Sequence, residues 1–140
     1  MSPIAVLGAG GWGTTLALLL DGKNYSVRLW EYRRLAAERL QLERENVEFL
    51  PGIPLPESIL IHYDAEKCLE GVRVVLLAIP SQFVRSALKN LVAYVPANAI
   101  IVNAAKGIEE ETLKRPSEVV ADLIPEALHD RYVALSGPSH

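Results

Sequence analysis

Short apolar runs rich in β-branched residues alternate with helix-length amphipathic segments along the whole chain. Several of these runs are continuous rather than alternating with polar residues, which is typical of strands buried on both faces of a parallel sheet. The pattern predicts six strands, at residues 4–7, 27–30, 59–61, 74–79, 100–102 and 132–135. It predicts five helices between them, at residues 11–21, 33–45, 65–69, 82–92 and 117–124. This order indicates an α/β fold built on a doubly wound parallel sheet with right-handed crossovers.

Glycines and prolines mark the predicted ends of several helices and one irregular segment. Gly22 follows the first predicted helix where a C-terminal cap would lie, and Pro80 and Pro116 stand near two predicted helix starts. Residues 46–56 are irregular, and three prolines in that segment exclude a helix or a central strand. No repeat, low-complexity tract or linker divides the sequence, so we expect residues 1–140 to form one domain.

The bulk composition excludes several functional classes. Half of the 140 residues are apolar and 22% are charged, which fits one folded domain with one core. The net charge of −3 argues against a general nucleic-acid binder. The apolar stretches are too short to cross a bilayer, and the first residues lack the charged region of a secretory signal. A single cysteine, Cys68, excludes an internal disulfide and a thiolate zinc site. We therefore expect a cytoplasmic domain that binds no nucleic acid and is not inserted in a membrane.

The first predicted strand runs directly into a glycine-rich turn. Residues 8–13 read Gly-Ala-Gly-Gly-Trp-Gly, which is G-x-G-x-x-G between a strand and a helix at the start of a βαβ unit. In this context Gly8 permits the tight turn, Gly10 lets the backbone approach a pyrophosphate, and Gly13 allows close packing of helix on strand. The helix start adds unpaired N–H groups and the positive end of its dipole. The sequence thus predicts a Rossmann-like dinucleotide-binding domain, in which Trp12 either flanks the cofactor or caps the core.

Acidic and basic residues stand together after the second predicted strand. Glu31 lies eighteen residues beyond Gly13, where an acid binds the adenosine ribose and favours NAD, whereas arginine accommodates the 2′-phosphate of NADP. Arg33 and Arg34 open a helix whose glutamates come later, an order that opposes the helix dipole. Either a phosphate attracts Arg33, or the two arginines belong to a solvated helix face. We expect NADP and NAD both to be used, with a preference for NADP.

Three further segments follow predicted strands and would lie at the carboxyl edge of the sheet, where ligands bind in this fold. They are Pro80-Ser81-Gln82, Asn103-Ala104-Ala105-Lys106-Gly107-Ile108-Glu109 and Ser136-Gly137-Pro138-Ser139. Together with the glycine turn and residues 46–56, they closely resemble the NAD(P)-dependent glycerol-3-phosphate dehydrogenases of the bacterial type. The motifs occur in the family's order along the whole chain, and the Lys-Gly-Ile-Glu and Ser-Gly-Pro-Ser segments are the most selective of them.

The resemblance assigns roles to individual residues. The predicted cofactor-binding residues combine the glycines of the turn with the positions that match the family's cofactor contacts. They are Gly8, Gly10, Gly11, Trp12, Gly13, Tyr32, Arg33 and Lys106. The positions that match its substrate contacts are Lys106, Gly137 and Ser139. Gly11 replaces a serine that is frequent in the family, and Phe49 replaces a common tyrosine, so two hydroxyl contacts are absent.

The resemblance also implies an activity and a missing part. Enzymes of this family interconvert dihydroxyacetone phosphate and glycerol 3-phosphate for phospholipid synthesis, and we expect the full-length enzyme to be a homodimer. They continue after Ser-Gly-Pro-Ser into a helical domain that carries the catalytic lysine and most of the substrate's phosphate site. This chain stops at His140, so we expect a dinucleotide-binding domain that is inactive alone. His62, His129 and His140 have no recognisable partner and are expected to be solvated, and the sequence shows no metal-ligand cluster.

Two alternatives share the first motif. Another two-domain dehydrogenase, such as a ketopantoate reductase or a nucleotide-sugar dehydrogenase, would have the glycine turn without the Lys-Gly-Ile-Glu and Ser-Gly-Pro-Ser segments. A non-enzymatic nucleotide-sensing module also uses this fold. Such a module has no need of a lysine after the fifth strand, and Lys106 therefore argues against it.

Overall fold

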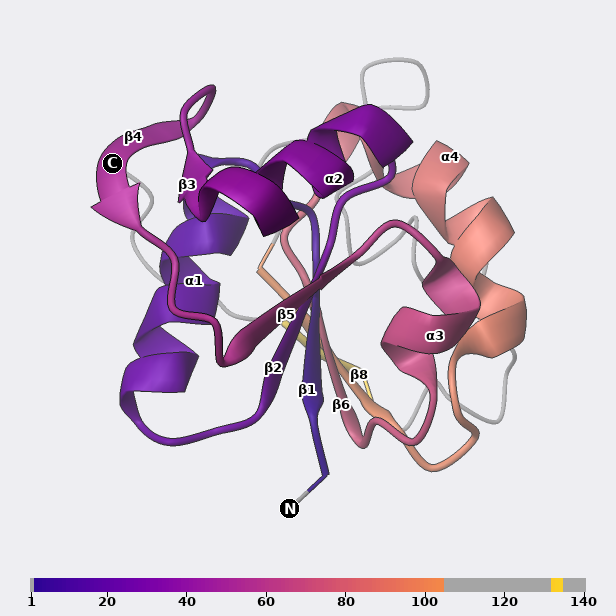
Figure 1. Ribbon diagram of the computed structural model, residues 1–140. Helices are drawn as coiled ribbons and strands as arrows, with labels where there is room; N and C mark the ends of the chain where they lie inside the picture. The colour runs from indigo at the N-terminus through magenta and orange to yellow at the C-terminus, as the bar shows by residue number, and fades with distance from the viewer. Residues whose placement is uncertain (1, 105–131, 135–140) are drawn as a thin grey trace.

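The computed structural model describes residues 2–104 and 132–134, and its centre is a parallel sheet (Figure 1). The six strands lie in the order β5-β2-β1-β6-β7-β8. Their bounds are β1 (Ile4–Leu7), β2 (Val27–Trp30), β5 (Ile59–His62), β6 (Val74–Leu77), β7 (Ile100–Asn103) and β8 (Tyr132–Ala134). The chain builds the sheet outward from β1 to β5, then returns to the other side of β1 and builds outward again. This reversal between β1 and β6 confirms the doubly wound topology.

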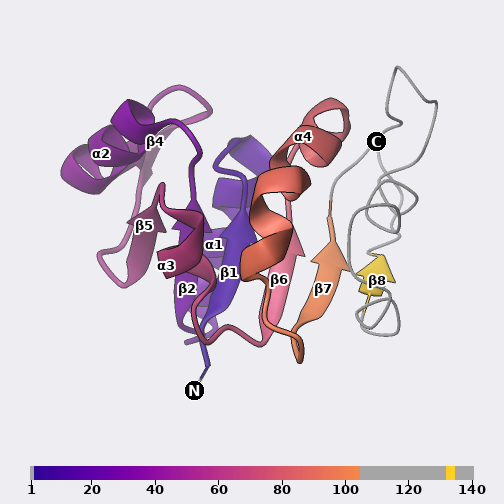
Figure 2. The same ribbon diagram turned by 90° about the vertical axis from the view of Figure 1, so that its right-hand side faces the viewer.

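Helices cover both faces of the sheet, as Figures 1 and 2 show. Their bounds are α1 (Gly11–Gly22), α2 (Arg34–Glu43), α3 (Ala65–Leu69), α4 (Ser81–Leu91) and a short 3-10 helix at Val92–Tyr94. Successive strand residues point to opposite faces. Val6 therefore packs in the cluster that contains residues of α1 and α2, and its neighbour Leu7 packs with residues of α3 and α4. The described helices include none with the length and apolar character needed to span a lipid bilayer.

Two helix ends differ from the sequence prediction. Gly22 is the last residue of α1, Lys23 is its cap, and the positive φ of 67° falls on Asn24, so the predicted glycine cap is wrong. Asparagine tolerates the left-handed region because its side chain is short and polar, which explains why no glycine is needed there. The second helix ends at Glu43 rather than residue 45, because Arg44 turns the backbone left-handed with a φ of 55°. Pro116 and the helix predicted at residues 117–124 lie outside the described residues.

The proline-rich segment forms a small hairpin of its own. Its strands β3 (Glu45–Asn46) and β4 (Leu50–Pro54) pair antiparallel and form a two-stranded sheet apart from the central one. The hairpin lies beside α2 and above the start of α1 (Figure 1). Prolines are tolerated there because a strand at a sheet edge has N–H groups that need no partner. The exclusion of a central strand is thus confirmed, although this part of the chain is more regular than the sequence indicated.

Candidate nucleotide-binding site

The glycine turn between β1 and α1 leaves no room for side chains at two of its positions. Gly8 has a φ of +118°, and a Cβ there would lie 2.8 Å from the carbonyl oxygen of Ala78. A Cβ on Gly13 would overlap the carbonyl oxygen of Gly8, which confirms the packing role expected of Gly13. Gly10 differs, because a Cβ there would meet no atom within 4 Å. The turn therefore packs tightly against the sheet on one side and faces open space at Gly10.

A cavity of about 530 Å³ lies beside this turn. Four segments line it: the glycine turn, the end of β2 with the residues that follow it, Phe49 of the hairpin, and several residues between positions 79 and 90, after β6 and in α4. Strands β2 and β6 lie on opposite sides of β1, so the cavity spans the switch point of the sheet. Its size falls within the range of small-molecule sites, and this is the place where doubly wound folds bind ligands.

Glu31 is the buried charge of the site. It follows β2 directly, is only 4% exposed, and contacts Arg33 twice through Oε1. The backbone N–H of Arg33 donates to this oxygen at 3.1 Å, and Nε–H of the same residue donates to it at 2.8 Å. The two contacts fix the guanidinium beside the carboxylate at the edge of the cavity.

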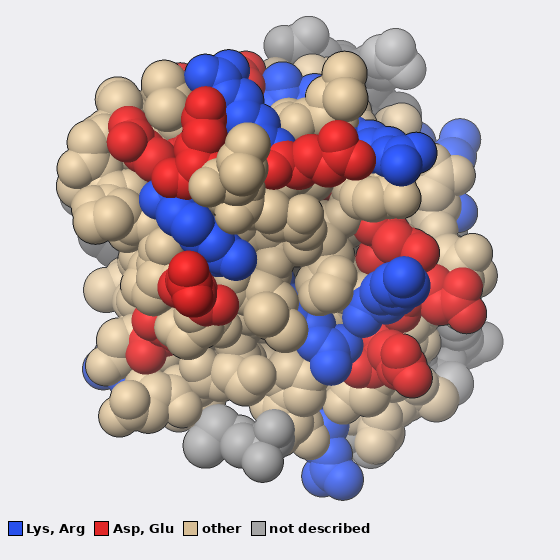
Figure 3. Space-filling model, in the orientation of Figure 1, with Lys and Arg blue, Asp and Glu red and all other residues tan. Residues whose placement is uncertain are grey.

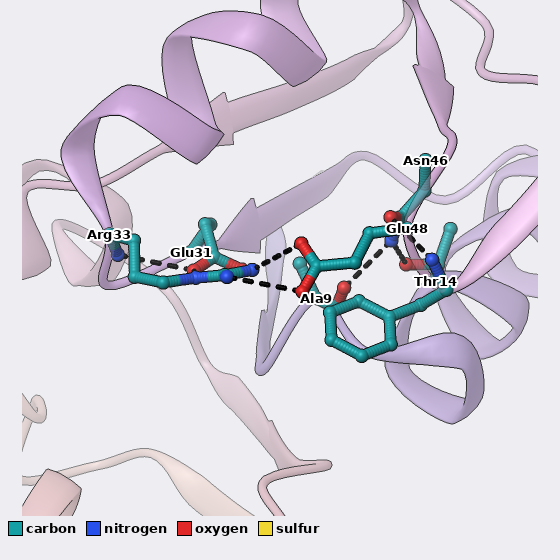
Figure 4. A network of polar contacts seen from close by, with 7 residues as sticks. Ala9, Thr14, Glu31, Arg33, Asn46 and Glu48 are labelled. Carbon is teal, nitrogen blue, oxygen red and sulfur yellow. Dashed lines mark hydrogen bonds and ion pairs between the residues drawn. The ribbon is translucent and has the colours of Figure 1, made fainter.

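A second carboxylate holds the outer end of the same guanidinium (Figure 4). Arg33 Nη1 donates to Glu48 Oε1 at 3.3 Å, and Nη2 donates to Oε2 at 3.0 Å. The rings of Tyr32 and Phe49 lie 5.8 and 5.9 Å from its central carbon. Hydrogen bonds to Glu31 and then to Glu48 raise the pKa of Arg33 above its usual value. Arg33 therefore belongs to an organised cluster and not to a solvated helix face.

Arg34 lies on a solvated helix face, which was one of the two alternatives predicted for the pair of arginines. Its guanidinium pairs with Glu38 one turn along α2 at 3.2 Å, and both side chains are about half exposed or more. Arg39 and Glu43 repeat the arrangement at 2.9 Å. Blue and red side chains consequently lie next to one another on this part of the surface (Figure 3). Exposed pairs of this kind contribute little to stability, so the two adjacent arginines have different roles.

Hydrogen bonds from the buried Asn46 connect the hairpin to the glycine turn and to α1. Asn46 is 3% exposed, and its Nδ2 donates to the carbonyl oxygen of Ala9 at 2.7 Å and to Thr14 Oγ1 at 2.9 Å (Figure 4). Its Oδ1 accepts the backbone N–H of Phe49 at 3.2 Å. A Cβ on Gly11 would lie 3.1 Å from the carbonyl oxygen of Phe49, so the hairpin closes tightly over the start of α1.

Sequence reasoning missed both Asn46 and Glu48. Asn46 could have been found from its residue type. An asparagine side chain commonly accepts a backbone N–H a few residues later and so indicates a turn. The pairing of Glu48 with a residue fifteen positions earlier carries no comparable signal, because it depends on where the hairpin docks.

Trp12 extends from the start of α1 toward the other half of the sheet. Its indole Nε1 donates to the carbonyl oxygen of Ala104 at 3.0 Å, just after β7. Trp12 is 42% exposed and does not line the cavity beside the glycine turn, so the two predicted roles, flanking the cofactor and capping the core, both stay predictions. Of the other predicted site residues, Tyr32 is exposed at the cavity, whereas Lys106, Gly137 and Ser139 lie outside the described residues.

Cys68 is buried and His62 is partly buried. His62 ends β5, and its Nε2 is buried without a hydrogen-bond partner, so this nitrogen is not solvated as the sequence led us to expect. Burial, and then the charge of Arg28, lower the pKa of His62. Burial raises the pKa of the Cys68 thiol to about 12, as befits a core residue. His129 and His140 are not described. In residues 2–104 and 132–134, no three His, Cys, Asp or Glu side chains are placed to hold a metal ion.

The topology and the turn together define a class of protein. A doubly wound parallel sheet with a G-x-G-x-x-G turn beside a cavity at its switch point is a dinucleotide-binding type of domain. Residues 3–140 match the family described as NAD-dependent glycerol-3-phosphate dehydrogenase N-terminus, and the chain belongs to this family.

Individual relatives agree with the family match. The chain is 46% identical over 137 residues to glycerol-3-phosphate dehydrogenase [NAD(P)+] of Chlorobium phaeobacteroides, covering 98% of this chain and 41% of that protein. The structure of glycerol-3-phosphate dehydrogenase from Coxiella burnetii superposes with a TM-score of 0.85 at 34% identity, covering 99% of this chain and 42% of that one. The yeast enzyme from Saccharomyces cerevisiae gives a TM-score of 0.78 at 25% identity, over 99% of this chain and 42% of its own. The chain thus spans about two fifths of the length of these relatives.

Proposed function

We propose that this chain is the NAD(P)-binding domain of a glycerol-3-phosphate dehydrogenase, an enzyme that interconverts dihydroxyacetone phosphate and glycerol 3-phosphate. One observation carries the proposal. In a member of this family, the glycine turn and the Glu31–Arg33 pair border the same cavity at the switch point of the sheet. Family membership also favours a dehydrogenase over a nucleotide-sensing module.

The residues of the cavity fit a nicotinamide dinucleotide. Gly10 faces open space at the start of α1, where free N–H groups and the helix dipole favour a pyrophosphate. Glu31 stands at the end of β2, the position from which an acid binds the adenosine ribose. Tyr32 and Phe49 supply aromatic walls, and Arg33 supplies a cation for a 2′-phosphate. When bound, the dinucleotide donates or accepts the hydride.

The acid and the arginine together support the use of both cofactors. NAD needs only the carboxylate for its ribose hydroxyls, whereas NADP presents an additional dianionic group to the guanidinium. Since Arg33 is oriented by its bond to the buried Glu31, it is already held at the edge of the cavity. This arrangement supports dual use with a preference for NADP.

The substrate is assigned to the residues that match the family motifs. We place its binding on Lys106, Gly137 and Ser139, and place the catalytic lysine and most of the phosphate site in a helical domain beyond residue 140. Lys106 follows the end of β7 by three residues, and β7 lies in the half of the sheet across the switch point from Glu31. A cytoplasmic homodimer is the proposed state of the full-length enzyme.

Titration of the protein with NADH and NADPH tests the proposal. We expect both to bind, and Arg33→Ala to weaken NADPH about tenfold or more while NADH changes little, because a charge-assisted contact is worth about 1.5–3 kcal/mol. Arg34→Ala is the matched control, since it removes the neighbouring exposed guanidinium. Equal losses for the two cofactors would remove Arg33 from the 2′-phosphate site. If neither cofactor binds the unaltered protein, the proposed function is wrong.

A further inference from the structure

All three nitrogens of the Arg33 guanidinium donate hydrogen bonds to carboxylates. Nε–H donates to Glu31, and Nη1 and Nη2 donate to the two oxygens of Glu48. Arginine recognises a phosphate with a parallel pair of N–H groups, the same geometry that Glu48 now uses. A phosphate that reaches Arg33 therefore has to compete with Glu48 for these donors.

We propose that Glu48 is a specificity-determining residue that competes with the 2′-phosphate of NADP for Arg33 and thereby weakens NADP binding relative to NAD. This inference rests on the proposed function, in which the cavity holds a nicotinamide dinucleotide. NAD carries a hydroxyl where NADP carries the phosphate, so NAD leaves the Arg33–Glu48 pair in place.

The two carboxylates around Arg33 have unequal roles because their burial differs. The Glu31 side chain is 5% exposed, so breaking its pair with Arg33 would leave an uncompensated buried charge, which is costly. The Glu48 side chain is 55% exposed, and an ion pair in that setting is weak and can be displaced. Glu31 thus fixes the guanidinium, while Glu48 is the partner that a phosphate can replace.

Glu48 acts on the cofactor only through Arg33. It lines a smaller cavity of about 220 Å³ beside α2 and the hairpin, and it is not among the residues that line the larger cavity of the proposed site. Arg33, Glu31 and Ala9 line both cavities, so they stand between Glu48 and the place proposed for the dinucleotide. A loss of the Glu48 charge should consequently leave the binding of NAD unaffected.

The anchored hairpin keeps Glu48 near the phosphate even after displacement. Asn46 donates to Ala9 of the glycine turn and to Thr14 of α1, and it accepts the N–H of Phe49, so residues on both sides of Glu48 are fixed (Figure 4). A displaced carboxylate therefore stays close to Arg33 and repels an incoming phosphate. Like charges held close together at an interface are unfavourable, which adds to the effect of the competition itself.

The experiment compares Glu48→Gln with Glu38→Gln in titrations of the protein with NADPH and NADH. Glutamine preserves the shape of the side chain and removes its charge, and Glu38 is a matched control because it pairs with the neighbouring Arg34. We expect Glu48→Gln to lower the dissociation constant of NADPH about fivefold or more and to leave that of NADH within about twofold. Glu38→Gln should leave both within about twofold. In an Arg33→Ala background, the gain from Glu48→Gln should fall to the level of the control.

Three results would overturn the inference. An unchanged NADPH constant in Glu48→Gln, an equal gain for NADH, or a gain that persists without Arg33 would each show that Glu48 does not compete for this arginine. Failure of both dinucleotides to bind the unaltered protein is a different result, because it overturns the proposed function and the inference together. Circular dichroism of each variant verifies that the fold is retained.

Discussion

Arg33 and Gly10 show how single residues shape the proposed site in opposite ways. Arg33 pairs with one buried and one exposed carboxylate. The buried Glu31 fixes one end of the guanidinium, whereas another anion can replace the exposed Glu48 at the other end. Gly10 contributes by lacking a side chain, because its Cβ position opens onto space that no protein atom fills. Gly8 and Gly13, in contrast, are required by the protein itself, since their Cβ atoms would collide with backbone. A substitution can therefore separate binding from folding at Gly10, but not at Gly8 or Gly13.

Gly10→Val should abolish dinucleotide binding while the fold survives. The backbone at Gly10 has φ −75° and ψ −172°, which valine adopts without strain, and the added methyl groups would extend into the space proposed for the pyrophosphate. We expect affinity for NADH and NADPH to fall about a hundredfold or more, and the free energy of unfolding to fall by about 1 kcal/mol, since valine is a poor helix N-cap. Calorimetric titration and urea unfolding measure the two effects.

Gly22→Val is the matched control for this change. Gly22 ends the same helix, and a Cβ there also meets no atom within 4 Å. Gly22 does not line the cavity of the proposed site, so its substitution should leave the affinity for both dinucleotides intact. Undiminished binding by Gly10→Val would show that the glycine turn does not approach the pyrophosphate.

At the scale of elements, the sequence was informative where hydrophobic runs decide the structure. The strands of the central sheet follow from continuous apolar segments whose side chains are buried on both faces, and the helices follow from the amphipathic segments between them. The hairpin at residues 45–54 had no such signal, because β3 is two polar residues long and β4 contains two prolines and a glycine. Its contacts with the glycine turn come from tertiary docking through Asn46, which local propensity does not encode. The candidate site was thus predictable at Glu31 and Arg33 but not at Glu48.

The burial of His62, at the end of β5, should make the stability of the protein depend on pH. His62 has a pKa below 6.5 in the folded protein, caused first by burial and then by the charge of Arg28. Below pH 6.5 the unfolded chain therefore binds more protons at this histidine than the folded protein does. The free energy of unfolding should decrease as the pH falls through 6.5 toward the folded pKa, and the contribution of neutral His62 should be complete above that range.

His62→Gln isolates this contribution. Urea unfolding at pH about 7.5 and about 5.5 should show a larger loss of stability for the unaltered protein than for the variant, because glutamine does not titrate. His129 and His140 are present in both proteins, so their effects cancel in the comparison. The same pH dependence in the two proteins would mean that the burial of His62 does not affect its protonation.

At the scale of the whole molecule, the carboxyl edge of the sheet brings distant segments together. The glycine turn, the residues after β2 and the residues after β6 all border one cavity, and Trp12 connects the start of α1 to Ala104 after β7. The adenine side of the proposed site depends on β1 and β2, which lie on one side of the switch point. Strand β7 lies on the other side, beyond β6. We therefore predict that a residue that follows β7 serves the nicotinamide and substrate side of the crevice.

Lys106 is the residue to which this argument applies, since it comes two positions after Ala104. We predict that Lys106 contacts the substrate and not the phosphates of the cofactor, because its ammonium can donate to the oxygen on the reacting carbon and oppose the charge that develops there. In the proposed full-length dehydrogenase, Lys106→Met should lower kcat/KM for dihydroxyacetone phosphate about a hundredfold or more and leave the NADPH dissociation constant nearly unchanged. Lys89→Met, which removes an exposed lysine near the end of α4, should change neither value. A collapse of cofactor affinity with normal turnover at saturation would instead place Lys106 at the cofactor's phosphates, on the adenine side of the switch point.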